Sequence, residues 1–480
     1  MRYCGISEFF HDAGIAFITD RGDIEFAAHS ERYSKVKLDY NIHDDLWNMI
    51  RNDDHTVFYE DINDPKYKKE WIELNYSNNN RGLIPNALDY NASINHHISH
   101  AANAFYTRPW VSKEDTVIMT IDGQGQQQTM GIYDYNFNLL EKELMPKSVG
   151  IFYNRITEYL GLKSMQDEYI VMGLSSYGEP TIYEKFLKIY DDIEFIDKHK
   201  NPIKAYYVNK KILGSIKAAC KNETHENIAA SIQKLTEVKI LEWAKKARGY
   251  GSKLVYAGGV AENIMANTLI KPLFDDLWIP SAPGDAGSAL GAAAYIYGKN
   301  TGKDYINWKD AYLGYDIKRE INPKEVVDHL LDHTYCGIAN GRAEFGPRAL
   351  GNRSLIADVR YDVKDTVNEI KRRQKYRPFA PAILEEFADQ YFEGPMSEYM
   401  KYTAKALHDY KSVIHVDGTS RVQVVKKDCN SIIRPILEEY YERTGVPMLL
   451  NTSLNIRGMP MVNDEKDAAA WEREYKVKVF

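Results

Sequence analysis

The sequence predicts an α/β protein with a duplicated N-terminal domain and a separate C-terminal domain. At 480 residues the chain is too long for one compact core, so two or three domains are expected. A buried strand, an acidic loop and a hairpin follow one another twice, once from residue 3 and once from residue 116. Residues 298–325 are polar and lack strong periodicity. We therefore place the boundary there, which gives domains at residues 1–310 and 325–480.

The first repeat begins at residues 3–7, whose apolar pattern predicts a short buried strand. His11 and Asp12 follow this strand, and a hairpin with its turn at residues 20–23 comes next. Both side chains therefore lie in the loop between the first two strands, where they can face a cleft; a turn capped by Asp12 is the alternative. Residues 50–85 are polar and predict mainly loop with short helices.

The second repeat begins at residues 115–121, another apolar run that predicts a buried strand. It ends in Asp122, which Gly123 and Gly125 follow, and a hairpin with its turn at residues 136–138 comes next. An acidic residue before glycines at a strand end suits a metal ion or a phosphate, because the backbone can come close there. The repeated order predicts a duplicated fold, as in the actin-like ATPases, in which each half contributes a phosphate loop.

A predicted buried helix lies between the two repeats, since residues 99–106 are mostly small or apolar. His96 and His100 are four residues apart, so on a helix their imidazoles leave the same face and can share a metal ion. Without the glutamate of the zinc-protease motif, such a pair is more often a hydrogen-bonded core pair. Asp122 and Asp285, each at the end of an apolar run, favour the metal site.

A further strand is predicted at residues 254–257, and two glycines follow it before a helix at residues 264–270. A glycine pair that opens a helix after a strand suits a nucleotide, because the helix N-terminus and the bare backbone favour anions. Tight packing of helix on strand explains the glycines equally well. We assign nucleotide contacts to Gly258, Gly259, Glu262 and Asn263. Farther on, Asp285 begins a helix of small residues that can pack close against a sheet.

The C-terminal domain opens with a predicted strand at residues 334–339 and then sets arginines among glycine and proline turns, at residues 341–354 and 371–381. Rigid turns with arginines can fix a polyphosphate bidentately. A solvated basic helix face is the alternative for residues 371–375, but the neighbouring residues 377–381 are too conformationally fixed for a mere surface. Further polar groups follow strand-like runs at residues 417–423 and 449–455.

The bulk properties exclude some classes of protein. The net charge of −7 does not indicate nucleic acid or an anionic membrane as a partner. The four cysteines have no metal or redox spacing, no signal-peptide pattern opens the chain, and no apolar run approaches the ~20 residues that cross a bilayer. We expect a cytoplasmic protein without membrane contact. The 35 tyrosines, with frequent Asn, Lys and Ile, indicate an AT-rich and viral source, which would place it in the host cytoplasm.

The sequence resembles the O-carbamoyltransferases of the nodulation, cephalosporin and tobramycin type nearly from end to end. The matching motifs are Gly5-Ile6-Ser7 with His11-Asp12, His96 to Ala101, Asp122-Gly123, Met172-Gly173-Leu174 with Tyr177-Gly178, Ala257 to Ala261, Asp285-Ala286-Gly287, Glu344 to Ser354, Arg377 to Pro381, and Asn451 to Asn455. The resemblance implies an actin-like (ASKHA) N-terminal domain, related to tRNA threonylcarbamoyl transferases, and a YrdC-like C-terminal domain. One departure is Ile170, where the family usually has a lysine.

The resemblance also implies a two-step reaction. The YrdC-like domain would make carbamoyl-adenylate from carbamoyl phosphate and ATP, with Mg²⁺ accompanying ATP, and release pyrophosphate. The residues implied for binding phosphates are Arg348, Lys371, Arg373, Arg377 and Arg421, and Ser453 and Asn455 would hold the nucleotide. The actin-like domain would transfer the carbamoyl group to an acceptor hydroxyl. There a divalent metal, Fe(II) by analogy, would be held by His96, His100, Asp122 and Asp285, and His11 beside Asp12 would be the general base.

The acceptor stays open between 5-hydroxymethylcytosine in DNA and a hydroxyl of a small sugar or antibiotic-like molecule. Residues 198–221 hold seven lysines with no Asp or Glu, and His199, Tyr206 and Tyr207 lie among them, which suits a nucleic-acid strand or, equally, a solvated face. Two other functions are a non-catalytic nucleotide-binding regulator, favoured by Ile170, and a tRNA threonylcarbamoylation enzyme, although that pathway usually divides the two domains between proteins. A homodimer is also left open.

Overall fold

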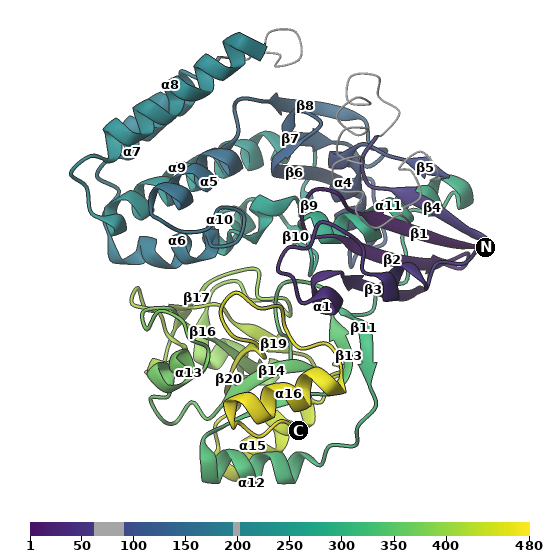
Figure 1. Ribbon diagram of the computed structural model, residues 1–480, viewed down its shortest axis with the longest axis vertical. Coiled ribbons are helices and arrows are strands. Elements are labelled where there is room, and N and C mark those ends of the chain that lie inside the picture. The colour runs from purple at the N-terminus through teal and green to yellow at the C-terminus, as the bar shows by residue number, and fades with distance from the viewer. Residues whose placement is uncertain (62–90, 195–201) are drawn as a thin grey trace. The chain divides into compact units, whose positions relative to one another are not determined.

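The structure is a computed structural model that describes residues 1–61, 91–194 and 202–480, with side chains from residue 208 onward in the last range. The chain divides into two compact units (Figure 1). Unit 1 consists of Met1–Ile24, Tyr40–Ile42 and Asn48–Trp308, and unit 2 of Glu25–Asp39, His43–Trp47 and Lys309–Phe480. Nothing in the sequence indicated that two short N-terminal segments belong to unit 2.

The first sheet of unit 1 is centred on β1 (Arg2–Ser7). The antiparallel strand β2 (Gly14–Thr19) pairs with it on one side and the parallel strand β4 (Asp54–Phe58) on the other, and β5 (Ala92–Ser93) continues parallel to β4. The loop prediction for residues 50–85 is therefore wrong at Asp54–Phe58, and residues 62–85 lie outside the described part. The sequence did not predict this strand because it begins with a charged residue, Asp54. In the structure the Asp54 carboxylate is buried and forms an ion pair of 2.6 Å with the Arg2 guanidinium.

The second sheet repeats this arrangement around β6 (Thr116–Gly125). The antiparallel strand β7 (Gln128–Tyr133) lies on one side and the parallel strands β9 (Lys253–Ala257) and then β10 (Asp276–Trp278) on the other, while β8 (Leu139–Leu144) extends the edge at β7. Both sheets thus place an antiparallel neighbour on one side of a central strand and two parallel strands on the other. This repeated order confirms the duplicated, actin-like α/β fold predicted from the sequence.

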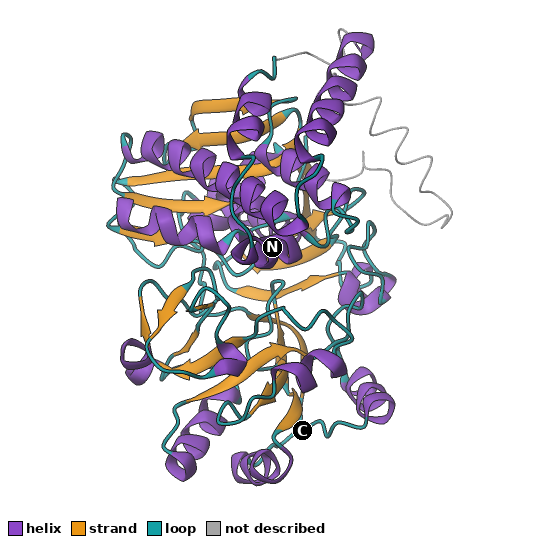
Figure 2. Cartoon of the chain, turned by 90° about the vertical axis from the view of Figure 1, so that its left-hand side faces the viewer, coloured by secondary structure: helices purple, strands orange, loops and turns teal. Residues whose placement is uncertain are grey.

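Two helices, α4 (His96–Tyr106) and α11 (Asp285–Thr301), pack at the centre of unit 1. The helix α11 begins at Asp285 as the sequence predicted, and α4 begins at His96, before the apolar residues 99–106. Small residues let α11 approach its neighbours at backbone distance. A Cβ built on Gly5 of β1 would lie 1.8 Å from the Ala289 carbonyl oxygen, and one on Gly291 would lie 1.9 Å from the Ser99 carbonyl oxygen. Figure 2 shows helices packed against the strands. The first residues of both helices are therefore held in fixed positions.

In the described part of the chain, the other α-helices of unit 1 are α5 (Val149–Tyr159), α6 (Glu168–Leu174), α7 (Tyr183–Asp191), α8 (Pro202–Cys220), α9 (His225–Arg248) and α10 (Ile264–Ile270). They lie beside the second sheet, where α5 and α9 contact its strands and the rest pack on these helices or on one another. Together with the sheet they bury a core that includes Val117, Phe152, Ile232 and Tyr256. None of the helices among the described residues is long and apolar enough to cross a membrane.

Unit 2 is built on a mixed sheet with the strand order β12-β14-β20-β15-β19. These strands are β12 (Tyr335–Ala339), β14 (Arg353–Ala357), β20 (Met448–Ser453), β15 (Ala380–Leu384) and β19 (Gln423–Val425). Register pairs Ser354 with Ser453, Ala380 with Asn451 and Ala382 with Gln423. The beginnings of β14, β15 and β19 therefore meet the end of β20 at one edge of the sheet.

Shorter elements and helices complete unit 2. Strands β11 (Tyr312–Ile317) and β13 (Gly341–Glu344) form a pair, and β16 (Phe392–Glu393), β17 (Ala404–Ala406) and β18 (Thr419–Ser420) form a small sheet. The helices are α1 (Glu31–Ser34), α2 (Asp44–Trp47), α12 (Pro323–His333), α13 (Lys364–Ile370), α14 (Ala388–Tyr391), α15 (Ile433–Thr444) and α16 (Glu465–Tyr475). Strand β3 (Ile24–His29) begins at the last residue of the first segment of unit 1 and continues in unit 2.

Candidate active site

Four side chains converge at the centre of unit 1. His96 Nε2 and His100 Nε2 lie 3.0 Å apart on one face of α4. Asp122 Oδ2 is 2.9 Å from the first nitrogen and 3.2 Å from the second, and Asp285 Oδ1 lies 3.7 and 3.3 Å from them. One ligand atom from each residue lies within 4.8 Å of all the others, and all four residues are buried. The structure thus brings together the four residues that the sequence predicted as a metal site.

Local backbone features fix these four residues. The Asn95 side chain accepts hydrogen bonds from the first amides of α4 and so sets where the helix with both histidines begins. Asp122 lies where the pairing of β6 with β7 shifts register, not at the strand end that the sequence predicted, since β6 continues to Gly125. Asp122 Oδ1 accepts a hydrogen bond of 3.1 Å from Gly259 N, and Asp285 is the first residue of α11.

The outer nitrogen of each imidazole also has a partner. Glu60 Oε1 lies 2.8 Å from His96 Nδ1, and Ser288 Oγ lies 3.1 Å from His100 Nδ1. Neither residue was predicted from the sequence. Glu60 follows β4 by two residues, so predicting β4 would have placed Glu60 beside the other strand ends. Ser288 is one turn after Asp285 on α11 and was hidden among the small residues of that helix.

The carboxylates also govern the protonation of the histidines. Burial lowers the pKa of His96, but Asp285, Asp122 and Glu60 more than offset it and raise the pKa well above its usual value. The pKa of His100 is raised in the same way, by Asp122 and Asp285 against burial. By contrast, burial and the neighbouring His96 lower the pKa of His97 to about 3. The cluster therefore attracts a cation, whether protons or a metal ion.

His11 and Asp12 reach the same cluster. His11 Nδ1 lies 3.1 Å from Asp12 Oδ2, and His11 Nε2 lies 3.4 Å from Asp285 Oδ2. Burial lowers the pKa of His11, but Asp285 and Asp12 outweigh burial and raise it to about 9. Asp12 adopts a positive φ of 55°, which turns the chain sharply at the loop. The predicted pair therefore lies beside the four-residue cluster.

The glycine pair after β9 makes the close contacts that tight packing requires. Gly258 has φ = +100°, and a Cβ there would lie 2.1 Å from the Ile121 carbonyl oxygen. A Cβ on Gly259 would lie 2.9 Å from Asp122 Oδ1. Asn263 caps α10 by accepting a hydrogen bond from Ala266 N, and Glu262 precedes it at the end of the turn. The nucleotide contacts assigned to these residues stay a prediction.

Unit 2 gathers the second set of predicted residues at one edge of its sheet. Arg348 lies in the loop before β14, Arg373 and Arg377 lie before β15, Arg421 lies before β19, and Ser453 ends β20. Asn451 of β20 joins β19 and the loop before β14, because its Nδ2 donates to the Ala349 carbonyl at 3.1 Å and to Gln423 Oε1 at 2.6 Å. The sheet register therefore brings these cationic loops to the same place.

Lys371 is the most buried of these cations, with 3% of its surface exposed. Its Nζ donates to the carbonyl of Ser453, to Asn455 Oδ1 at 2.9 Å and to the Asn455 carbonyl at 3.1 Å. Burial, together with Arg373 and Arg377, lowers the pKa of Lys371 well below its usual value. A solvated basic face is therefore the wrong description of Lys371. It fits Lys375, which is exposed and pairs with Glu369 at 3.0 Å.

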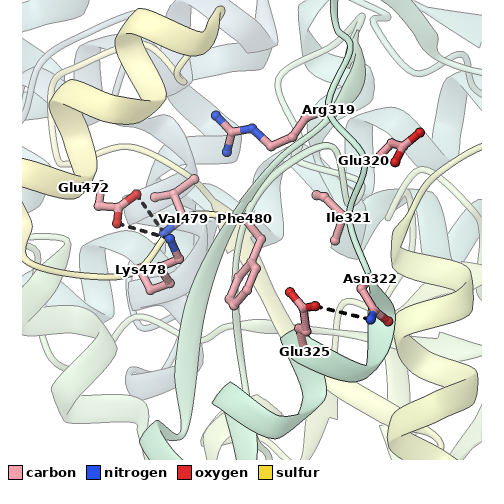
Figure 3. Close-up of a pocket in the computed structure, with 9 residues that line it drawn as sticks. All are labelled: Arg319, Glu320, Ile321, Asn322, Glu325, Glu472, Lys478, Val479 and Phe480. Carbon is pink, nitrogen blue, oxygen red and sulfur yellow. Dashed lines mark hydrogen bonds and ion pairs between the residues drawn. The ribbon is translucent and has the colours of Figure 1, made fainter.

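A pocket of about 370 Å³ lies elsewhere in unit 2 (Figure 3). Two of its charged lining residues, Lys478 and Glu472, form an ion pair of 3.6 Å. Asn322 donates a hydrogen bond to Glu325 in the same pocket. No predicted site residue lines this pocket, so we do not place the active site there.

Two sequence features lie outside these sites. Ile170, the position at which the sequence departs from the family resemblance, is 1% exposed in α6 and packs as a core residue. Of the lysine run, Lys198 and Lys200 lie outside the described residues, as do the side chains of Lys204 and its neighbours up to residue 207. The remaining four lysines are exposed on or just after α8: Lys210, Lys211, Lys217 and Lys221.

The fold and the sites define an actin-like α/β protein with a candidate metal centre in one unit and a cationic candidate site in the other. The chain belongs to the carbamoyltransferase family and is a transferase. The family model described as Carbamoyltransferase N-terminus matches residues 51–294, and the one described as Carbamoyltransferase C-terminus matches residues 327–480.

Curated relatives agree with this assignment. The chain is 33% identical to nodulation protein NolO of Bradyrhizobium diazoefficiens over 78% of this chain and 75% of that protein. It is 33% identical to nodulation protein NolNO of Sinorhizobium fredii, over 78% of this chain and 60% of that one. Among solved structures, the activator of 2-hydroxyisocaproyl-CoA dehydratase from Clostridium difficile is 15% identical with a TM-score of 0.38, covering 63% of this chain and 96% of that one.

Proposed function

We propose that the chain is an ATP-dependent O-carbamoyltransferase that makes carbamoyl-adenylate in unit 2 and transfers the carbamoyl group in unit 1. Overall, carbamoyl phosphate, ATP and water would give carbamoyl-adenylate, pyrophosphate and phosphate, and the adenylate would then carbamoylate an acceptor hydroxyl and release AMP. The observation that carries the proposal is the meeting of Lys371 with the arginine loops at one sheet edge, in a chain of this family.

In unit 2, the proposed work of the residues is to bind and neutralise phosphates. Arg348, Arg373, Arg377 and Arg421 would offer forked N–H donors to the phosphate oxygens of ATP, accompanied by Mg²⁺. Lys371, held by Ser453 and Asn455, would add a point charge whose cost of burial is offset once an anion is bound. Ser453 and Asn455 would hold the nucleotide.

In unit 1, the proposed centre holds a divalent transition metal. Glu60 and Ser288 engage the outer nitrogens of His96 and His100, and the inner nitrogens converge with the two carboxylates on one point. Two imidazoles and two carboxylates suit such an ion, which would act as a Lewis acid toward the carbamoyl or phosphoryl oxygen. Iron(II) is our proposal for its identity, on the family resemblance.

His11 would take the proton of the acceptor hydroxyl at Nε2. Asp12 orients the ring through Nδ1, and Asp12 and Asp285 stabilise the imidazolium that results. In the metal-free protein, the same carboxylates raise the pKa of His11 to about 9, so the imidazole is mostly protonated at neutral pH. A bound cation beside Asp285 would reduce that effect and free the base.

For the acceptor we propose the hydroxymethyl group of 5-hydroxymethylcytosine in DNA. Lys210, Lys217 and Lys221 are exposed and share one face of α8 and its end, since they are seven and four residues apart. A chain with net charge −7 needs such a local basic surface to approach DNA. A small sugar or antibiotic-like hydroxyl is the second candidate.

The test is mass spectrometry of reactions with ATP, Mg²⁺, carbamoyl phosphate and a panel of acceptors. Hydroxymethylated DNA, the free hydroxymethylated nucleoside and small sugars would be compared. We expect a carbamoyl mass on the DNA and release of pyrophosphate. A carbamoyl mass on a small molecule alone would replace the acceptor proposal. If neither pyrophosphate nor carbamoyl product forms, the chain is a non-catalytic nucleotide-binding protein, consistent with Ile170.

A further inference from the structure

Glu60 lies against the four-residue cluster without offering it a ligand atom. Its Oε1 is 2.8 Å from His96 Nδ1, on the opposite side of the ring from Nε2, which Asp122 approaches at 2.9 Å. Glu60 is 8% exposed and His96 is 2% exposed, so little water reaches their hydrogen bond. A carboxylate in such a place is costly unless it receives a strong hydrogen bond.

We propose that Glu60 is a positioning residue that fixes His96 as the Nδ1–H tautomer and thereby directs a bare Nε2 lone pair into the cluster. This inference rests on the proposed metal centre. An ionised carboxylate can only accept, so the proton in this hydrogen bond comes from His96 Nδ1. The neutral ring then has no proton left for Nε2, the nitrogen that faces His100 and Asp122.

The backbone of Glu60 is held as firmly as its side chain. Glu60 follows Tyr59, whose amide donates to the Ile6 carbonyl at 3.0 Å and so continues the pairing of β4 with β1. The Tyr59 ring also packs against His96, with 5.5 Å between the ring centroids. The carboxylate is therefore presented from the end of a sheet strand, and small displacements of its position are resisted.

The second histidine has a different outer partner. Ser288 Oγ lies 3.1 Å from His100 Nδ1, and a hydroxyl can either donate or accept. Ser288 therefore does not impose a tautomer, whereas Glu60 does. A carboxylate partner also makes the ligating nitrogen more basic. The two imidazoles are thus unequal, and His96 is the one whose affinity for a metal depends most on its outer partner.

The first test measures Co(II) affinity of the full chain by competition with a chelator. E60Q should weaken Co(II) binding by about 10–100-fold, because its amide can offer a donor to Nδ1 and favour the wrong tautomer. S288A should weaken binding by less than E60Q. Tyr59→Phe is the matched control, since its hydroxyl has no hydrogen-bond partner among the described residues and the ring contact is kept.

The second test needs no variant. In Zn(II)-loaded wild-type protein with ¹⁵N-labelled histidine, NMR should show the His96 proton on Nδ1 and the metal on Nε2. A proton on Nε2, or E60Q binding Co(II) as tightly as wild type, would overturn the role of Glu60 while leaving the metal centre intact. Wild-type protein that binds neither Co(II) nor Zn(II) would overturn both the metal centre and this inference.

Discussion

The two candidate sites of the chain are electrostatic opposites. In unit 1, imidazole nitrogens and carboxylate oxygens face one another at 2.9–3.7 Å, and the carboxylates raise the pKa of His96 and His100. In unit 2, Lys371 is buried beside Arg373 and Arg377, whose positive charges lower its pKa. The first site therefore favours a cation and the second an anion. The proposed carbamoyl-adenylate chemistry needs both, because it binds phosphates in one step and activates a carbonyl in the other.

The largest effect is expected when the imidazole ligands of the candidate metal site in unit 1 are removed, which tests whether this site binds a cation. The double variant H96A/H100A should lose its metal ion and lower carbamoyl transfer by about 10³-fold or more, while pyrophosphate release persists. Metal content by mass spectrometry and both activities would be measured. H97A is the control, because His97 bonds Thr120 and the Gln128 carbonyl; it should melt earlier yet keep the metal. Full metal occupancy in the double variant would make the pair a core feature.

The corresponding change in unit 2 removes an anion ligand. R348A should lower pyrophosphate release by about 10²-fold or more, because a bound polyphosphate loses a forked donor. R372A is the matched control, because this arginine is exposed and its ion pair with Glu474 is 4.0 Å long. Pyrophosphate release would be followed with a coupled assay. An unchanged rate in R348A would rule out this edge of the sheet as the adenylation site.

A smaller effect is expected in the number of protons that unit 2 takes up when it binds an anion. The lowered pKa of Lys371 leaves its amine neutral at pH values between that pKa and the ordinary lysine value of about 10.4. The phosphates of ATP raise this pKa, so ATP binding should take up as much as one proton per chain in that window. Calorimetry in two buffers of different ionisation enthalpy would measure it. K371M should abolish the uptake, and an uptake that K371M retains would point to another group.

Lys371 also gives a signed pH effect on stability. The unfolded chain binds a proton that the folded chain lacks, so the free energy of unfolding should rise as pH rises from the folded-state pKa to about 10.4. Chemical denaturation of wild type and K371M at several pH values would measure this slope. The same slope in both proteins would show that Lys371 is not its source.

The smallest predicted effect concerns the surface of α8. Replacing Lys210, Lys217 and Lys221 with Gln should lower the salt slope of DNA binding by about 2–3, at roughly 0.7–0.9 for each phosphate that a lysine no longer neutralises. Carbamoylation of a free hydroxymethylated nucleoside, which has no flanking phosphates, should stay the same and serves as the control. A triple variant that modifies hydroxymethylated DNA like wild type at moderate salt would remove α8 from the DNA surface.

Regular spacing in the sequence predicted the site residues on the two central helices and missed Glu60, which follows a strand without such a pattern. The spacing of His96 and His100 was sufficient to place them on one face of α4, and the small residues after Asp285 predicted the start of α11. Glu60 escaped notice because β4 carries the buried ion pair of Asp54 with Arg2, which makes a core strand look polar.

Unit 2 shows why part of the candidate site could not be predicted from the sequence. The basic composition of residues 371–375 fits a solvated helix face and a phosphate site equally well. Only the register of β20 against β14 and β15 places Ser453 and Asn455 over Lys371 and leaves Lys375 outside. Such pairings join residues that are far apart in the chain, and no local pattern in the sequence encodes them.

The geometry of the candidate metal site depends on a glycine in the contact between α11 and α4, Gly291. A methyl group at Gly291 would press on the carbonyl of Ser99, the residue before His100, and would displace the helix that begins with Asp285. A substitution far from any reacting atom would therefore change the spacing between an imidazole and a carboxylate. In a library of random variants, Gly291 should behave like an active-site residue although it has no functional group at all.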